Sequence, residues 1–364
     1  MADRSTLRLQ GVDAARGAAL LGMVAAHVLP AEAEDGSLTL VDQIVSGRSA
    51  ATFAVLAGVG LALASGRWDL RGRLALLLRA VLIGAVGLLL GGLDSGIAVI
   101  LAYYAVLFVL VQPFLSWRPR RLLPWAVGLA LLVPVLSQQV RDQLPDRDVD
   151  SPGLDRLEEP GPLLSELLLT GYYPAAAWVA YLLLGLAVGR LALRRARTAA
   201  LLALAGAGLV VASEATSRLL LGPLGGREVL LAGSQDVQLD RGFFGNVPTE
   251  PTWWLAVDAP HSTTPPDLFG TGGAALLVLG VALLLASRLA VVLSPLSAVG
   301  SMPLSLYAAH VTLLDLTDTD DPQQYYLLQV AVGLVAALLW RRYVGRGPLE
   351  AALAAASRVV TGRP

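Results

Sequence analysis

Residues 11–30 read GVDAARGAALLGMVAAHVLP, an apolar segment long enough to cross a bilayer as a helix. Arg16 and His27 are eleven positions apart in it. At about 100° per residue, their side chains leave the helix within about 20° of one another. Asp13 lies one turn before Arg16 on nearly the same face. Because such polar side chains are costly in a lipid-facing helix, this stripe predicts a functional site within a membrane protein.

The composition places the whole chain in the same class. The 364 residues are 55% hydrophobic and 15% charged, with a mean hydropathy of +0.64. These values are typical of a polytopic helical membrane protein and not of a soluble domain. The chain has no cysteine, and every basic residue is arginine. Disulfides, a cysteine nucleophile and a lysine Schiff base are therefore excluded.

Apolar runs of about 17–24 residues predict an all-α, polytopic bundle of about ten transmembrane helices. We expect one integral membrane domain over residues 1–364. The expected spans are residues 12–30, 44–64, 74–92, 96–115, 122–138, 171–190, 198–221, 267–287, 290–313 and 323–342. Two long loops, about 139–170 and 222–266, are expected on the outer side of the membrane.

Charge orients this bundle, because cytoplasmic loops of membrane proteins are enriched in arginine. The arginine-rich loops contain Arg67, Arg71, Arg73 and Arg79; Arg118, Arg120 and Arg121; Arg190, Arg194, Arg195 and Arg197; and Arg341, Arg342 and Arg346. The opposite loops contain most of the acids, among them Glu32, Glu34 and Asp35, those within 142–155, and Asp315, Asp318, Asp320 and Asp321. Ten spans with both termini in the cytoplasm fit this alternation.

A cleaved signal peptide is the alternative reading of the first segment. Arginines precede a short apolar core, and Ala31-Glu32-Ala33 resembles a cleavage site. Cleavage would remove Arg16 and His27. The shared polar face favours a retained helix, since a signal sequence does not need one.

Several motifs point to one superfamily. Gly11-Val12-Asp13, Arg16-Gly17 and the Arg-x10-His spacing to His27 resemble the transmembrane acyltransferase superfamily and its acyltransferase-3 signature. Other segments resemble the bacterial heparan-α-glucosaminide N-acetyltransferase-like, YeiB-type branch: GRSAATFAVLAG at 47–58, ILAYYAVLF at 100–108, TGYYPAAAWVAYLLLGLAVGR at 170–190 and GRGPLE at 345–350. Many members of that branch have asparagine in place of His27, so a catalytic histidine is implied only by the acyltransferase-3 pattern.

The resemblance implies an acyl-CoA-dependent membrane acyltransferase. It would move an acyl group, acetyl in the first instance, from cytoplasmic acyl-CoA to a hydroxyl or amine of an extracytoplasmic glycan or glycolipid. Acetyl-CoA or another acyl-CoA is the expected co-substrate, and no metal is expected. The expected location is a bacterial-type plasma membrane, with the lipid bilayer as surroundings. No nucleic-acid partner is expected, and a homodimer is left open.

The resemblance also suggests roles for the polar stripe. Arg16 and His27 are about 16 Å apart along a helix axis, comparable to a phosphopantetheine arm. We expect Arg16, aimed by Asp13, to hold the phosphates of CoA, because guanidinium groups pair bidentately with phosphate. Arg73 and Arg79 are further cofactor-binding candidates. The alternative for these two is that they only set the membrane orientation.

His27 is the candidate general base, with a covalent acyl-histidine as the second option. Asp13 is too distant to orient it, so the partner of His27 must come from another helix. His310 is the second catalytic candidate and His261 a substrate-binding one, because all three histidines lie in the expected outer half. Arg48 is a candidate for polarising the thioester carbonyl, or else an interface arginine. Zinc binding has no supporting spacing.

Two aromatic residues complete the expected site. Tyr104 is a candidate hydrogen-bond donor to substrate, or else a core residue. Trp254 is a candidate sugar-binding surface, or else a membrane-interface anchor. The competing function is a transporter or flippase that uses the same polar cavity, although the sequence shows no internal repeat.

Overall fold

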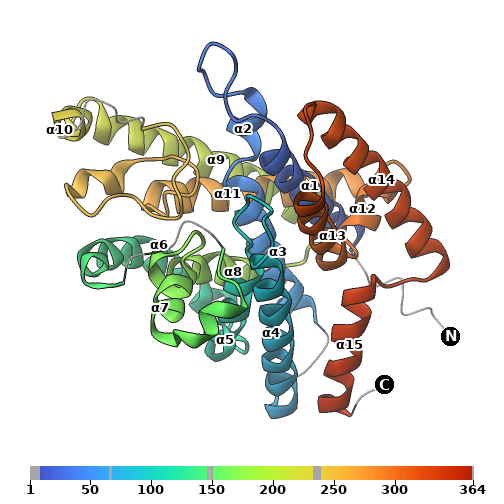
Figure 1. The fold of residues 1–364 in the computed structure, drawn as a ribbon. Coiled ribbons are helices and arrows are strands. Elements are labelled where there is room, and N and C mark those ends of the chain that lie inside the picture. Colours follow the sequence, from blue (N-terminus) through green and yellow to red (C-terminus); the bar gives the residue numbers. More distant parts are fainter. Residues whose placement is uncertain (1–8, 65–67, 146, 148–150, 233–238, 363–364) are drawn as a thin grey trace.

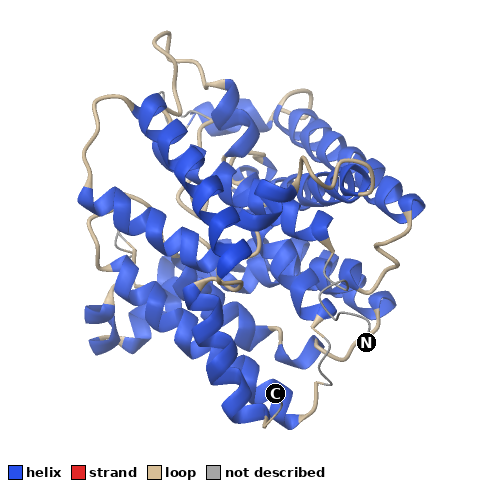
Figure 2. Cartoon of the chain, turned by 90° about the vertical axis from the view of Figure 1, so that its right-hand side faces the viewer, coloured by secondary structure: helices blue, strands red, loops and turns tan. Residues whose placement is uncertain are grey.

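The computed structural model describes residues 9–64, 68–145, 147, 151–232 and 239–362. Within these residues it is helical, with one isolated bridge between Glu32 and Leu38 and no named strand (Figures 1 and 2). The predicted all-α class is confirmed. Arg67, Asp146, Asp148 and Asp150 lie outside the described residues.

The helices follow the apolar runs of the sequence. The α-helices are α1 (Gln10–Val28), α2 (Leu40–Val45), α3 (Arg48–Leu63), α4 (Leu70–Gly91), α5 (Leu101–Leu110), α6 (Pro119–Val140), α7 (Pro160–Ser165), α8 (Ala175–Gly189), α9 (Ala196–Leu221), α10 (Gly226–Ala232), α11 (Pro265–Ala286), α12 (Ser294–Val299), α13 (Pro303–Leu316), α14 (Pro322–Tyr343) and α15 (Pro348–Thr361). Short 3₁₀ turns are η2 (Gln112–Phe114), η3 (Arg141–Gln143), η4 (Leu154–Glu158) and η6 (Thr252–Ala256), and η5 (Glu166–Thr170) is a π-helix.

Among the described residues, six helices are long and apolar enough to cross a membrane. They are Leu40–Leu63 (α2 with α3), Leu70–Gly91, Pro119–Gln143 (α6 with η3), Ala196–Leu221, Pro265–Ala286 and Pro322–Tyr343. A seventh candidate is the pair Pro160–Thr170 and Ala175–Gly189, which is bent by 53°. The predicted count of about ten spans is not confirmed by length and composition, nor is the location of the termini.

Three regions differ from the sequence prediction. The expected span 290–313 is divided into α12 and α13, because Pro303 has no N–H and begins a new helix. The expected span 96–115 contains the ten-residue α5 and the short η2 instead of one long helix. The expected loop 139–170 ends in α7 and η5, where Glu166 and Leu167 are buried.

The core lies where α3 crosses α8. A Cβ on Gly185 would lie 1.9 Å from the Val55 carbonyl oxygen, and one on Gly58 would lie 2.2 Å from that of Leu182. The two backbones are therefore in direct contact. Thirteen of the fifteen residues of α8 are buried, which makes α8 the centre of the bundle.

A second close contact joins α1 to the end of α12. A Cβ on Gly17 would lie 2.1 Å from the Leu296 carbonyl oxygen, and one on Gly300 would lie 1.8 Å from that of Asp13. Helix α1 also contacts α3 and α11. The polar stripe of α1 is therefore enclosed by other helices.

Candidate functional site

The cationic end of the polar stripe is fixed by three helices. Arg16 pairs with Asp13 at 3.3 Å, one turn earlier on α1. Its guanidinium also donates to the carbonyl oxygens of Gly300 at 3.3 Å and Leu56 at 3.4 Å. Asp13 is buried, whereas the Arg16 side chain is 18% exposed. The predicted Asp13–Arg16 pair is confirmed.

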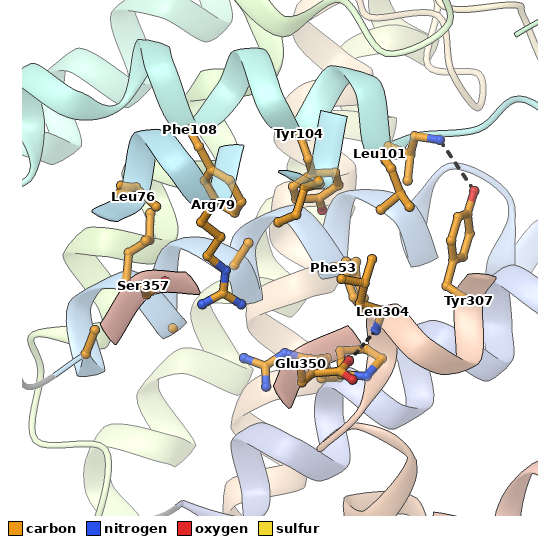
Figure 3. Close-up of a pocket in the computed structure, with 18 of the residues that line it drawn as sticks. Phe53, Leu76, Arg79, Leu101, Tyr104, Phe108, Leu304, Tyr307, Glu350 and Ser357 are labelled. Atoms are coloured by element: carbon orange, nitrogen blue, oxygen red, sulfur yellow. Dashed lines mark hydrogen bonds between the residues drawn. The ribbon is translucent and has the colours of Figure 1, made fainter. Parts of the chain in front are cut away.

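A cavity of about 410 Å³, here called the apolar pocket, opens beside Arg16. Its walls come from α1, α3, α4, α5, α13 and α15, and most of its lining is apolar. Arg79 of α4 and Glu350 of α15 face this space from opposite walls, with Tyr104 above (Figure 3). Glu350 accepts hydrogen bonds from the backbone N–H of Leu304 at 2.8 Å, which ties α15 to the start of α13.

A second cavity of about 560 Å³, here called the polar pocket, lies toward the other end of α1. Its polar lining residues are His27, Ser46, Ser49, Asp94, Ser151, Tyr172, Tyr173 and His261. Met23 lines both cavities. Met23 lies one turn before His27 on α1, so the residue that both cavities share is close to the histidine.

Two of the three histidines are hydrogen-bonded to each other. His27 Nδ1 lies 3.0 Å from Nε2 of His310, which belongs to α13. The two ring planes differ by only 7°. His310 Nδ1 lies 2.8 Å from Oε1 of Gln329 on α14. His27 therefore does have a partner on another helix, and that partner has a further one.

The third histidine faces the polar pocket from a loop. His261 packs against the rings of Tyr172 and Tyr173, with centroids 4.7 Å and 5.6 Å away. Its Nδ1 is buried and has no hydrogen-bond partner among the described residues. Burial lowers the pKa of His261 to about 4. The ring is therefore neutral at pH 7.

The loop of His261 is held in an uncommon conformation. His261 and Thr263 have φ values of 58° and 52°, in the left-handed region. Asp267, in the first turn of α11, accepts from the Thr263 N–H at 2.9 Å. The Thr264 side chain caps the same helix by accepting from the Asp267 N–H at 3.3 Å. The start of α11 thus fixes the position of the imidazole.

Three predicted site residues lie away from these groups. Arg73, in the first turn of α4, donates to the carbonyl oxygen of Trp68, just before that helix, at 3.2 Å, and to that of Gln112 in η2. Arg48 is the first residue of α3. Burial raises the pKa of Asp258, and the positive charge of Arg48 partly offsets that rise. Trp254 is buried in a separate apolar cluster beside Phe243.

The structure therefore forms two groups from the predicted residues. Asp13, Arg16, Arg79 and Tyr104 lie at or beside the apolar pocket. His27, His261 and His310 lie at or beside the polar pocket. Among the described residues, no group of three or more His, Asp or Glu side chains is arranged to hold a metal ion.

Sequence reasoning missed Gln329 and Glu350. Gln329 is a polar residue in the expected span 323–342, and such residues signal function in membrane helices. Glu350 lies in the GRGPLE segment without an assigned role. Both residues could be noticed in the sequence, but the sequence did not indicate which residues they contact.

The family model described as heparan-alpha-glucosaminide N-acetyltransferase, catalytic, matches residues 8–219. The match covers more than half of the chain and includes Arg16, His27, Arg79 and Tyr104. The helices that contribute His310 and Gln329 follow the matched region. A search of the curated proteins finds no match.

Proposed function

The chain belongs to the heparan-alpha-glucosaminide N-acetyltransferase catalytic family, and from that premise we propose that it acetylates a glycan or glycolipid across a bacterial-type plasma membrane. Acetyl-CoA would bind from the cytoplasm, and the acceptor amine or hydroxyl would bind from the opposite side. The observation that carries this proposal is that one residue, Met23, lines both cavities and lies one turn from His27.

The apolar pocket suits the donor. Arg16 and Arg79 supply two guanidinium groups, which bind phosphate oxygens in a fixed geometry. The apolar walls suit the pantetheine arm and exclude water from the thioester. Because Asp13 and two carbonyl oxygens already hold Arg16, its guanidinium is oriented before a ligand arrives.

The polar pocket suits a sugar acceptor. Ser46, Ser49, Asp94 and Ser151 line it and offer hydroxyl and carboxylate groups for hydrogen bonds to sugar hydroxyls. The rings of Tyr172 and Tyr173 give the same cavity an aromatic wall. This mixture of polar and aromatic lining supports a hydrophilic ring as the ligand.

His27, which lines the polar pocket one turn from Met23, would perform the proton transfer. As general base it takes the proton of the acceptor amine or hydroxyl while that atom attacks the thioester carbonyl. The new C–N or C–O bond forms, the C–S bond breaks, and CoA leaves as a thiolate that takes up the proton. In the covalent alternative, His27 first receives the acetyl group and then passes it to the acceptor. Both routes require an unprotonated ring nitrogen.

A transporter is the competing function. The break between α12 and α13 and the 53° bend before α8 are discontinuous helices, which transporters use at their binding sites. A transporter would move a solute without cleaving acetyl-CoA, so one assay separates the two functions.

The experiment measures transfer of radiolabelled acetyl from acetyl-CoA to a glucosamine-terminated oligosaccharide by purified protein. We expect His27→Ala to lose transfer by at least about 100-fold, the usual contribution of a general base, while acetyl-CoA affinity stays within about threefold. Thr312→Ala, an exposed position on α13, is the control and keeps its rate. Unchanged transfer by His27→Ala contradicts the catalytic role, and solute uptake without transfer favours the transporter.

A binding measurement tests the donor site. We expect Arg16→Ala to weaken acetyl-CoA binding about tenfold or more, because a charge-assisted contact contributes about 1.5–3 kcal/mol. Acceptor KM is expected to change little, since Arg16 lines the apolar pocket and not the polar one. Isothermal titration with acetyl-CoA measures this, and equal affinity of both proteins contradicts it.

A further inference from the structure

We infer that Gln329 is a positioning residue that holds His310 and His27 in one tautomer and leaves Nε2 of His27 unprotonated. The inference rests on the proposed function, since it concerns the ring nitrogen that would accept the proton. Gln329 itself lies two hydrogen bonds from the polar pocket and lines neither of the two cavities.

The contacts form a chain across three helices. Oε1 of Gln329 on α14 lies 2.8 Å from Nδ1 of His310 on α13. Nε2 of His310 lies 3.0 Å from Nδ1 of His27 on α1. The near-coplanar rings, 7° apart, align the second bond with the ring nitrogens.

The donor or acceptor role of each group in this chain determines which nitrogen of the next ring carries the proton. An amide oxygen only accepts, so Nδ1 of His310 must be the protonated nitrogen. A neutral imidazole has one donor and one acceptor, so Nε2 of His310 accepts. Nδ1 of His27 must then donate to it, which leaves Nε2 of His27 with its lone pair free. That lone pair is what the general base and the acyl-histidine route both need.

Burial of His310 and of the Gln329 amide nitrogen strengthens the case for this hydrogen-bond pattern. His310 is only 5% exposed, so water does not compete for its two bonds. The amide Nε2 of Gln329 is buried without a partner among the described residues. An unsatisfied buried amide donor is costly, and leucine or methionine would fill this position without that cost. The amide oxygen is thus the feature of Gln329 that the site uses.

The first test is spectroscopic and uses the unaltered protein. The chain has three histidines, so ¹⁵N NMR of ring-labelled protein contains six ring-nitrogen signals, assigned by replacing single histidines. At neutral pH we expect His27 and His310 to be protonated at Nδ1 and unprotonated at Nε2. Protonation of Nε2 on His27, or a mixture of tautomers, overturns the inference. This readout does not depend on transferase activity, so it separates failure of the inference from failure of the proposed function.

The second test is kinetic. Gln329→Met keeps the size of the side chain but removes the acceptor. We expect kcat for acetyl transfer to fall at least about tenfold, KM for acetyl-CoA to stay within about twofold, and the Nδ1–H signal of His27 to be lost or mixed with Nε2–H. Gln324→Met, at an exposed position of the same helix, is the control and should match the unaltered protein. A Gln329→Met protein with unchanged kcat and an unchanged tautomer overturns the inference.

Discussion

At the scale of single residues, the two ends of the α1 stripe are stabilised by different means. Arg16 is charged, and Asp13 together with two carbonyl oxygens surrounds its guanidinium. His27 is paired with another imidazole, that of His310, which in turn contacts the amide oxygen of Gln329. A carboxylate partner would favour a charged imidazole, whereas burial favours a neutral one, and His310 is buried. The arrangement therefore suits phosphate binding at one end and proton acceptance at the other.

His261 makes the stability of the protein depend on pH. Its folded pKa of about 4 lies below the ordinary value near 6.5, because the ring is buried. The unfolded chain therefore binds more protons than the folded chain between these pH values, and folding becomes less favourable as pH falls through that window. At pH 5 the expected loss is about 1–2 kcal/mol.

The measurement compares His261→Asn with the unaltered protein. Asparagine accepts a positive φ more readily than most residues and does not titrate. Between pH 7 and pH 5 we expect the thermal midpoint of the unaltered protein in detergent to fall further than that of His261→Asn. Equal falls in both proteins would exclude His261 as the titrating group.

Part of the site could be predicted because its partners are close in sequence. Asp13 and Arg16 are three residues apart on one helix, so their pairing follows from helical geometry alone. The bond between His310 and Gln329 spans 19 positions and that between His27 and His310 spans 283. Those contacts depend on how α1, α13 and α14 pack, which periodicity does not determine. The sequence predicted that the histidines lie at a similar depth, but it did not predict their hydrogen-bond partners.

At the scale of helices, the contact between α1 and α12 determines where Arg16 points. Gly17 and Gly300 let the two backbones meet, and Gly300 is also the residue whose carbonyl oxygen accepts from Arg16. The break that follows Gly300 separates α12 from α13, and α13 contributes His310 to the same side of α1. The break between α12 and α13 therefore provides a contact for Arg16 on one side and for His27 on the other.

We expect Gly300→Ala to destabilise the protein by about 1–3 kcal/mol, the usual cost of overpacking. The new Cβ would lie 1.8 Å from the Asp13 carbonyl oxygen, and backbone cannot move aside as a flexible side chain can. Acetyl-CoA affinity should fall as well, because α1 must shift and Arg16 with it. Thermal unfolding in detergent and titration with acetyl-CoA measure the two effects.

Gly333→Ala is the matched control for that prediction. A Cβ at Gly333, in α14, meets nothing within 4 Å. Since alanine is the better helix former, this variant should be as stable as the unaltered protein or more so. If Gly300→Ala behaves like Gly333→Ala, the close contact of α1 with α12 is not what fixes Arg16.

Helix boundaries show where the sequence was sufficient and where it was not. The limits of α4, α9, α11 and α14 fall within a few residues of the expected spans, because each is a long apolar run between polar segments. The expected span 290–313 failed because hydropathy does not register the missing N–H of Pro303. The π-helix η5 before Gly171 was also missed, because it ends an acidic, proline-rich segment that predicted a loop.

At the scale of the whole molecule, the proposed function requires the two cavities to open on opposite sides of a membrane. The cavities share Met23 but differ in character, with arginines beside one and serines, an aspartate and histidines beside the other. Along the chain, loops rich in arginine alternate with loops rich in acids, and arginine-rich loops favour the cytoplasmic side. Both divisions support cytoplasmic entry of the donor.

The absence of cysteine from the sequence allows a direct test of this orientation, because each introduced cysteine is the sole thiol. Four exposed positions serve: Glu34 and Asp320 in acid-rich loops, and Arg118 and Arg195 in arginine-rich ones. In intact cells, we expect a membrane-impermeant maleimide to label Glu34→Cys and Asp320→Cys. Arg118→Cys and Arg195→Cys should react only after the membrane is permeabilised. Labelling of Arg195→Cys in intact cells would reverse the orientation, and the apolar pocket could then no longer receive acetyl-CoA from the cytoplasm.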